Sequence, residues 1–259
     1  MQFSVRYIIL FSLAICGVCA VFVSSLAVSL KEAQEVNKLL DKKRNVLMAA
    51  GLVESGEKVE ASVVEERFAK FQPVVVDLET GEELSDVDPT TFDQRKAKKD
   101  PDMSREAPKN SAGVNRMPLQ ALVYKALDES GNVDMLIVPI EGYGLWSTLY
   151  GFLALDGDLN TVRGLAYYEH GETPGLGGEV ENPRWRALWP GRKVYNASGE
   201  PAIDVIKGVA GPAAENPHKV DGLSGATITS RGVSHMMNFW LGADGFGPYI
   251  KNLHQKGAA

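Results

Sequence analysis

Cysteine is nearly absent from the chain: its 259 residues include only Cys16 and Cys19. Both lie within an apolar N-terminal run, so the rest of the chain has neither disulfides nor thiolate metal ligands. A C-x-x-C pair can bind a metal or undergo redox chemistry. Within an apolar helix, however, two small side chains are more typical of helix packing, and we predict no metal site from them.

A basic surface is also missing. The net charge is −6, and the Lys and Arg residues are scattered among acidic ones. Because nucleic-acid binding normally requires a basic patch, the composition argues against a nucleic-acid partner. The chain also lacks the G-x-x-x-x-G-K-[ST] phosphate loop and the G-x-G-x-x-G dinucleotide fingerprint. The chain thus has no Walker-type phosphate loop, and the missing dinucleotide fingerprint argues against a nicotinamide-binding enzyme.

The N-terminal region has the longest apolar run, since no charged residue occurs from Tyr7 to Leu30. A membrane-spanning helix needs about 20 apolar residues, whereas the apolar core of a cleaved signal peptide has about 7–15. The run is longer than such a core, and a helical pattern follows it directly. We therefore favour a retained transmembrane anchor at residues 1–30 over a cleaved signal peptide, with a soluble domain at residues 31–259.

The charges on either side of this run leave the orientation open. Only Arg6 precedes it, whereas five Lys and Arg residues follow between positions 31 and 44. Taken alone, this difference would place the soluble domain in the cytoplasm. Acidic residues are interspersed among these bases, and large domains can cross the membrane regardless of charge.

The remaining chain has the pattern of an α+β domain. Helical spacing of apolar residues covers 31–51, where Gly51 is a plausible C-cap, and a second short helix is expected over 59–71. Strand-like segments follow, joined by turn signals at Thr80-Gly81, 129–132 and 157–160. We predict an antiparallel sheet with flanking helices in addition to one N-terminal transmembrane helix.

Residues 93–118 have a different composition. The segment is charged, contains three prolines and has almost no large apolar side chains. Such a sequence cannot bury much apolar surface, so we expect a surface loop or a partly disordered segment. Its basic cluster at 95–99 could contact a partner or lipid headgroups, although a solvated loop is the simpler interpretation.

The segment most suggestive of chemistry is Asp221 to Thr229, DGLSGATIT. From Val233 onward, apolar residues recur with helical spacing until Gly242. The preceding residues are small or hydroxyl-bearing, so their backbone amides can approach an anion near a helix N-terminus. An ordinary Ser/Thr helix cap would explain the same residues.

The motif Asp221-Gly-Leu-Ser224-Gly225-Ala226-Thr227 resembles the acceptor motif of bacterial proteins that carry phosphoester-linked FMN. This resemblance implies that a separate flavin transferase moves FMN from FAD onto Thr227. Thr229 is the alternative acceptor.

Two further segments extend the resemblance to essentially the whole chain: the GYGLW turn at 142–146 and HGETPGLG at 170–177. Together they resemble the family formed by the C subunit of the sodium-translocating NADH:quinone reductase and the related G subunit of the Rnf-type complex. In isolation, the second segment would be interpreted as a Pro/Gly-rich structural turn. The resemblance instead implies that the flavin ring contacts these segments, through Leu145, Trp146, Glu172, Thr173, Gly175, Leu176 and Gly177.

The resemblance implies a membrane-anchored electron carrier with covalent FMN, one of several subunits in a sodium-pumping complex. It implies a single-pass protein of the bacterial inner membrane with a periplasmic soluble domain, in contrast to the charge count. Two alternatives have other functions. One is a flavin-binding module without an electron-transfer role, and the other is a free-standing flavin reductase, which would need the missing nicotinamide site.

Overall fold

In a computed structural model, residues 4–54 and 56–257 are described. Residues 1–3 of the predicted anchor and residues 55, 258 and 259 of the predicted soluble domain therefore lie outside the described residues. The chain forms two compact units, residues 1–42 and residues 43–259. Helix α1 (Val5–Ala49) begins in the first unit, and its last turns belong to the second.

Helix α1 is the one helix among the described residues that is long and apolar enough to cross a membrane. Its most apolar window has a mean hydropathy of 2.5 and is not buried within the protein. The helix expected over 31–51 is a continuation of this one rather than a separate element. It ends as predicted at Gly51, where φ is +72° and the Leu52 N–H donates to the Leu47 carbonyl.

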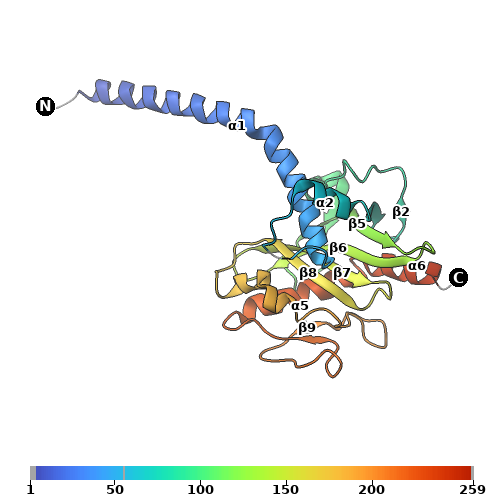
Figure 1. The fold of residues 1–259 in the computed structure, drawn as a ribbon. Helices are drawn as coiled ribbons and strands as arrows, with labels where there is room; N and C mark the ends of the chain where they lie inside the picture. Colours follow the sequence, from blue (N-terminus) through green and yellow to red (C-terminus); the bar gives the residue numbers. More distant parts are fainter. Residues whose placement is uncertain (1–3, 55, 258–259) are drawn as a thin grey trace. The chain divides into compact units, whose positions relative to one another are not determined.

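The second unit is built on a six-stranded sheet in the order β2-β1-β5-β6-β7-β8, in which all neighbours are antiparallel (Figure 1). Short turns connect β1 to β2, β5 to β6 and β7 to β8, at the three turn signals of the sequence. This confirms the predicted α+β fold. The strands are β1 (Gln72–Asp77), β2 (Glu83–Leu84), β5 (Gln120–Leu127), β6 (Val133–Tyr143), β7 (Thr148–Asp156) and β8 (Val162–Glu169).

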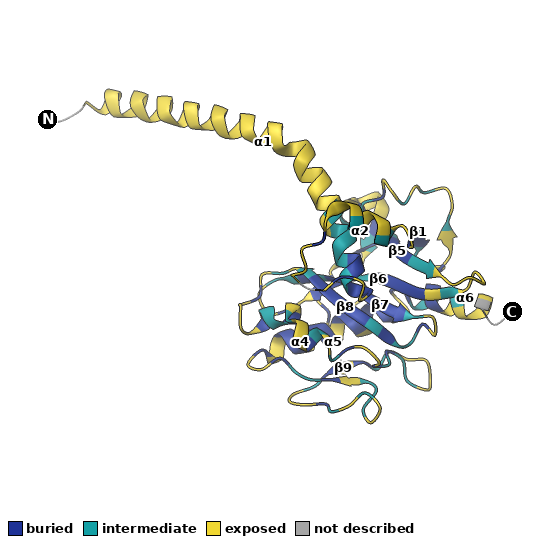
Figure 2. Ribbon diagram, viewed as in Figure 1, coloured by how far each residue is buried: buried dark blue, intermediate teal, exposed yellow. Residues whose placement is uncertain are grey.

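Helices cover both faces of the sheet, so its central strands are buried (Figure 2). Helix α5 (Thr227–Leu241) packs on one face, where the Tyr167 hydroxyl contacts the Met236 sulfur. On the other face, Phe68 of helix α2 (Ala61–Phe68) packs edge-on against Tyr124. Because side chains of a strand alternate between faces, each face supplies its own set of apolar side chains.

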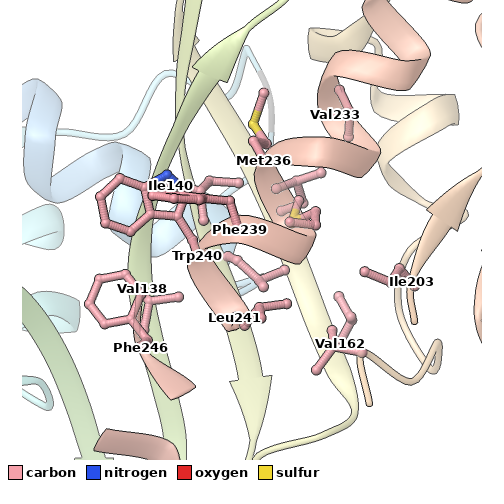
Figure 3. Packing of buried hydrophobic residues seen from close by; sticks show 14 of the residues in the cluster. Val138, Ile140, Val162, Ile203, Val233, Met236, Phe239, Trp240, Leu241 and Phe246 are labelled. Carbon is pink, nitrogen blue, oxygen red and sulfur yellow. The ribbon is translucent and has the colours of Figure 1, made fainter. Parts of the chain in front are cut away.

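The main core lies between the sheet and helix α5. Trp240 is fully buried there beside Phe246, and its indole N–H donates to the Glu141 carbonyl at 2.7 Å (Figure 3). Val138 and Ile140 of β6 face the same cluster (Figure 3). This packing fixes helix α5, and hence its first turn, against strand β6.

The expectation of a loop at residues 93–118 was wrong in part. The segment contains helix α3 (Gln94–Lys99), the 3-10 helix η1 (Pro101–Met103) and two short antiparallel strands, β3 (Ser104–Glu106) and β4 (Arg116–Pro118). Asp93 caps α3 by accepting the N–H groups of Arg95 and Lys96. Charged side chains attach the segment to the sheet, which composition alone does not reveal.

Shorter elements complete the second unit around helix α5. They are η2 (Gly177–Glu181), α4 (Pro183–Arg186), the parallel pair β9 (Asp204–Val205) and β10 (Lys219–Val220), and α6 (Gly247–Gly257). The Ser234 hydroxyl of α5 accepts the Val205 N–H at 2.8 Å, which ties β9 to the helix.

Candidate functional site

The first turn of helix α5 presents the two candidate threonines differently. The helix begins at Thr227, six residues before the apolar periodicity that predicted it. Thr227 is exposed, whereas Thr229 is only 1% exposed and its hydroxyl donates to Glu172 Oε2 at 2.6 Å. Of the two hydroxyl groups, only that of Thr227 is therefore open to solvent and accessible for modification.

Gly225 sets the path of the backbone that leads into the first turn of helix α5. Its φ is +72°, a backbone conformation that other residues rarely adopt, and a Cβ there would lie 2.9 Å from Leu176 Cδ2. Ala226 occupies the N-cap position and provides no side-chain hydrogen bond to the first turn. The helix thus begins with an exposed hydroxyl and no side-chain cap, an arrangement suited to an external anion.

Glu172 joins three segments that are far apart in the sequence. Its side chain is 5% exposed. Oε1 accepts the N–H groups of Leu145, Trp146 and Ser147 at 3.0, 2.9 and 3.3 Å, and Oε2 accepts the Thr229 hydroxyl. Both carboxylate oxygens are thus occupied by donors of the protein itself, so Glu172 supports the loops rather than facing outward.

These donors compensate for the burial of the Glu172 charge. Burial raises the pKa of Glu172, but the hydrogen bonds from Thr229 and from the amides of Trp146, Leu145 and Ser147 outweigh it. The net result is a pKa below the ordinary value, so the carboxyl group is ionised at neutral pH.

Glycines allow the backbone to close around this carboxylate. A Cβ at Gly144 would lie 2.7 Å from Glu172 Oε1, and one at Gly177 would lie 2.5 Å from Oε2. On helix α5, a Cβ at Gly232 would lie 2.3 Å from the Tyr143 carbonyl oxygen. Gly144 and Gly177, one from each of the GYGLW and ETPGLG segments, are therefore required for close packing around Glu172.

Apolar side chains that are exposed gather on the same three segments. From Leu52 onward, nine large apolar side chains of the described chain are exposed, and five of them lie near these glycines in the sequence. Trp146 is the most exposed of the five, at 66%. Such a set offers an apolar surface to a planar ring. The five are Tyr143, Leu145, Trp146, Leu176 and Ile228.

The other residues proposed for the site differ in their surroundings. Thr173, Gly175 and Ser224 are exposed, and the Thr173 carbonyl accepts the N–H groups of Leu176 and Gly178 to form the turn. Asp221 is half-buried and has a different role, because its carboxylate accepts the Ala210 N–H at 2.8 Å and its carbonyl accepts the Trp185 indole N–H. It therefore stabilises the base of the loop.

Sequence reasoning missed two serines and an arginine. The Ser147 hydroxyl accepts the Gly171 N–H at 2.6 Å, and the Ser230 hydroxyl accepts the Leu223 N–H at 3.1 Å. Arg231 is exposed one helical turn after Thr227, and the i, i+4 spacing of these two residues was a signal available in the sequence. The serines had no such signal, because their partners are backbone amides, one 24 positions from Ser147 and the other seven positions from Ser230.

Two cavities of the second unit are lined by residues other than Thr227. One, of about 960 Å³, is lined by residues 195–201 and helix α6, and the other, of about 400 Å³, includes Asp221 and Val209. Within residues 4–54 and 56–257, no cluster of three or more His, Cys, Asp or Glu side chains could hold a metal ion.

Known proteins resemble the chain over both the site and its full length. An FMN-binding domain family matches residues 144–242, a range that includes Leu145–Ser147, Glu172 and Thr227. The C subunit of the Na+-translocating NADH-quinone reductase of Pseudomonas aeruginosa is 48% identical over 100% of this chain and 99% of its own length. The corresponding protein of Yersinia pestis is 46% identical over 93% of this chain and 90% of its own length.

The fold has counterparts among solved structures. The crystal structure of Shewanella oneidensis NqrC superposes with a TM-score of 0.76 at 38% identity, covering 85% of this chain and 99% of that chain. The C subunit of the Parabacteroides distasonis reductase gives a TM-score of 0.64 at 28% identity, covering 85% and 96% respectively.

Proposed function

The chain belongs to the NqrC family, the C subunits of Na+-translocating NADH-quinone reductases, and on this basis we propose that it carries FMN, linked by a phosphoester to Thr227, as an electron carrier of that complex. The single observation that supports Thr227 is the difference between the two threonines. Thr227 is exposed, whereas Thr229 is buried and bonded to Glu172.

The residues around Thr227 fit the two ends of FMN. Amide groups of the first turn of α5 and its helix dipole favour a phosphate there. Arg231 lies one turn later, and helical side chains lean towards the N-terminus, so its guanidinium can approach a phosphate on Thr227. Trp146 and Leu176 offer apolar contacts to a ring. When bound, FMN supplies the redox chemistry, while the protein positions it and sets its electrostatic environment.

Attachment of the cofactor would use the Thr227 hydroxyl as the acceptor. Its oxygen bonds to the phosphorus of the FMN half of FAD, its proton is released, and the pyrophosphate bond breaks so that AMP leaves. A separate flavin transferase would catalyse this step. The exposure of Thr227 gives such an enzyme access.

The proposal also includes the place of the chain in the membrane. Helix α1 would be a retained single-pass anchor in the bacterial inner membrane, which holds the second unit near the other subunits of the complex. The soluble domain would face the periplasm. A cysteine introduced at the exposed Ser198 would then react with a membrane-impermeant maleimide in intact spheroplasts, whereas protection until lysis would place the domain in the cytoplasm.

The decisive experiment is co-expression of the full chain with a flavin transferase, followed by denaturing electrophoresis with flavin fluorescence and intact-mass measurement. We expect a fluorescent band for the wild type, for Thr227→Ser and for Thr229→Ala, and none for Thr227→Ala. Loss only in Thr229→Ala would move the attachment site by two residues. A wild-type chain without flavin, beside a transferase that is active on another substrate, would refute covalent attachment.

The electron-transfer role requires a separate test, since a flavin-binding module without that role is the competing function. The complex with its partner subunits would be mixed with NADH, and reduction of the flavin on this chain followed by absorbance. Reduction that is lost in Thr227→Ala supports the carrier. A flavin that stays oxidised in a complex active with NADH supports the binding module.

A further inference from the structure

We propose that Glu172 is a positioning residue: its buried carboxylate holds together the three segments that surround Thr227 and leaves a negative charge without a cationic partner beneath that surface. The effect of this charge on a flavin rests on the proposed attachment of FMN to Thr227. The structural part of the proposal stands on the hydrogen bonds of Glu172 alone.

The hydrogen bonds of the carboxylate support the positioning role of Glu172. Oε1 accepts three consecutive backbone N–H groups, from Leu145 to Ser147, and Oε2 accepts the Thr229 hydroxyl of helix α5. Glu172 itself belongs to the third segment, since it immediately precedes Thr173-Pro174-Gly175-Leu176. One side chain therefore sets the spacing between the loop with Trp146, the loop with Leu176 and the helix that begins at Thr227.

Neighbouring contacts strengthen this arrangement. The Gly171 N–H donates to the Ser147 hydroxyl at 2.6 Å, and the Glu172 N–H donates to His170 Nδ1 at 3.2 Å. Gly144 and Gly177 leave no room for a Cβ beside the two carboxylate oxygens. The carboxylate is thus held in one orientation by its hydrogen bonds and by close packing on both sides.

The charge of Glu172 has no cation to cancel it. All of its donors are neutral amide or hydroxyl groups, and within the described parts of the chain no Lys, Arg or His forms an ion pair with it. The histidine of the same loop, His170, directs its Nε2 to Glu181 instead, at 3.2 Å. A negative charge held near a bound redox group opposes the addition of electrons to that group.

Two substitutions separate geometry from charge. Glu172→Gln keeps an acceptor for the three amides, and its NH₂ group can face Thr229, so the loops stay in place while the charge is removed. Glu172→Ala removes both. Thr229→Val, which has nearly the same shape, removes only the bond to helix α5. Glu181→Gln is the matched control, because it removes a carboxylate from the same part of the chain at a position where the side chain is 52% exposed.

The first readout is amide hydrogen exchange in the full chain with Thr227→Ala, which does not depend on a bound flavin. We expect Glu172→Ala to speed the exchange of Leu145, Trp146 and Ser147 by roughly tenfold or more, the effect of losing hydrogen bonds to a charged acceptor. Glu172→Gln should change it much less. Unchanged exchange in Glu172→Ala would overturn the structural part.

The second readout is a redox titration of the flavin-loaded chain. Glu172→Gln should shift the ratio of reduced to oxidised flavin at a fixed potential by a factor on the order of five to ten towards the reduced form. Glu181→Gln should shift it less, because exposed charges are screened. A titration of Glu172→Gln that coincides with wild type would overturn the electrostatic part, since a purely structural residue would not move it.

The two readouts also distinguish this inference from the proposed function. If the wild-type chain takes up no flavin beside an active transferase, covalent attachment fails, and the exchange measurement still decides the role of Glu172. If flavin attaches normally and Glu172→Ala leaves both exchange and titration unchanged, only the role of Glu172 fails.

Discussion

Two regions of the second unit bury a glutamate, and they satisfy its charge by different means. Near Thr227, Glu172 is surrounded by three backbone amides and a hydroxyl group. Where helix α3 meets the sheet, the carboxylate of Glu141 pairs with Lys98, and Arg95 stacks 3.7 Å above Tyr150 while bonding Glu169. Neutral donors stabilise a charge without cancelling it, whereas a cation cancels most of its field.

This difference suggests a division of roles. The region around α3 uses ion pairs for attachment, so its net electrostatic influence on its surroundings is small. In the region around Thr227, the charge of Glu172 has only neutral donors, and the same segments carry exposed apolar side chains, which suits the binding of a ligand there.

The largest effect is expected from Gly177→Ala, which forces a methyl group against the carboxylate. Its Cβ would lie 2.5 Å from Glu172 Oε2 and 2.6 Å from the Thr229 hydroxyl. Both side chains are buried and cannot move aside without breaking their bond, so we expect a loss of about 3 kcal/mol in unfolding free energy. Chemical denaturation of the detergent-solubilised chain measures it.

Gly171→Ala is the control for this change, because its nearest neighbour, the Ser147 hydroxyl, would lie 3.3 Å away. It should cost much less than Gly177→Ala. Equal stabilities of the two variants would show that the carboxylate is not closely confined.

The next effect is expected from Lys98→Met in the contrasting region. The substitution keeps the apolar stem but leaves the buried Glu141 carboxylate without its cation. Because Lys98 is partly exposed, we expect a loss of about 2 kcal/mol, below the range for fully buried pairs. Flavin attachment should be unchanged. If Lys98→Met also lost its attached flavin, the two regions would not be separate in function.

Acid should reduce the contribution of Glu172 to the free energy of unfolding. Since the folded-state pKa lies below the ordinary value of 4.5, ionised Glu172 stabilises the fold above that value. The contribution is lost as the pH falls through the folded-state pKa. The difference in unfolding free energy between wild type and Glu172→Gln should therefore shrink between neutral pH and pH of about 3. Other carboxyl groups cancel in this difference. A difference that is constant with pH would contradict the assignment.

The sequence predicted those features whose signals are local. The turns of the β5–β6 and β7–β8 hairpins and the end of α1 at Gly51 depend on a few adjacent residues, and the structure confirms them. Helix α5 was expected from its apolar period, which begins at Val233. Its first turn went undetected by that period because polar contacts stabilise it, such as those of Thr229 and Ser230.

Long-range polar contacts account for what the sequence did not predict. Residues 93–118 have the composition of a loop, but Arg95 bonds a residue 74 positions away and Lys98 one 43 positions away. Similarly, Glu172 was proposed as a flavin contact from its motif, whereas its bonding partners lie 25–27 and 57 positions away. Neither composition nor periodicity contains information about such pairs.

The smallest effect is expected from Arg231→Gln, which tests whether a positive charge near Thr227 offsets the uncompensated carboxylate. Within the described chain, Arg231 is exposed and its side chain has no hydrogen bond or ion pair. An exposed charge pair contributes about 0.5 kcal/mol, so attachment by a limiting amount of flavin transferase should slow roughly twofold at low salt. Arg231→Lys should retain most of the rate, and about 0.5 M salt should abolish the difference through screening. Equal rates for Arg231→Gln and wild type at low salt would show that the helix N-terminus alone accommodates the phosphate.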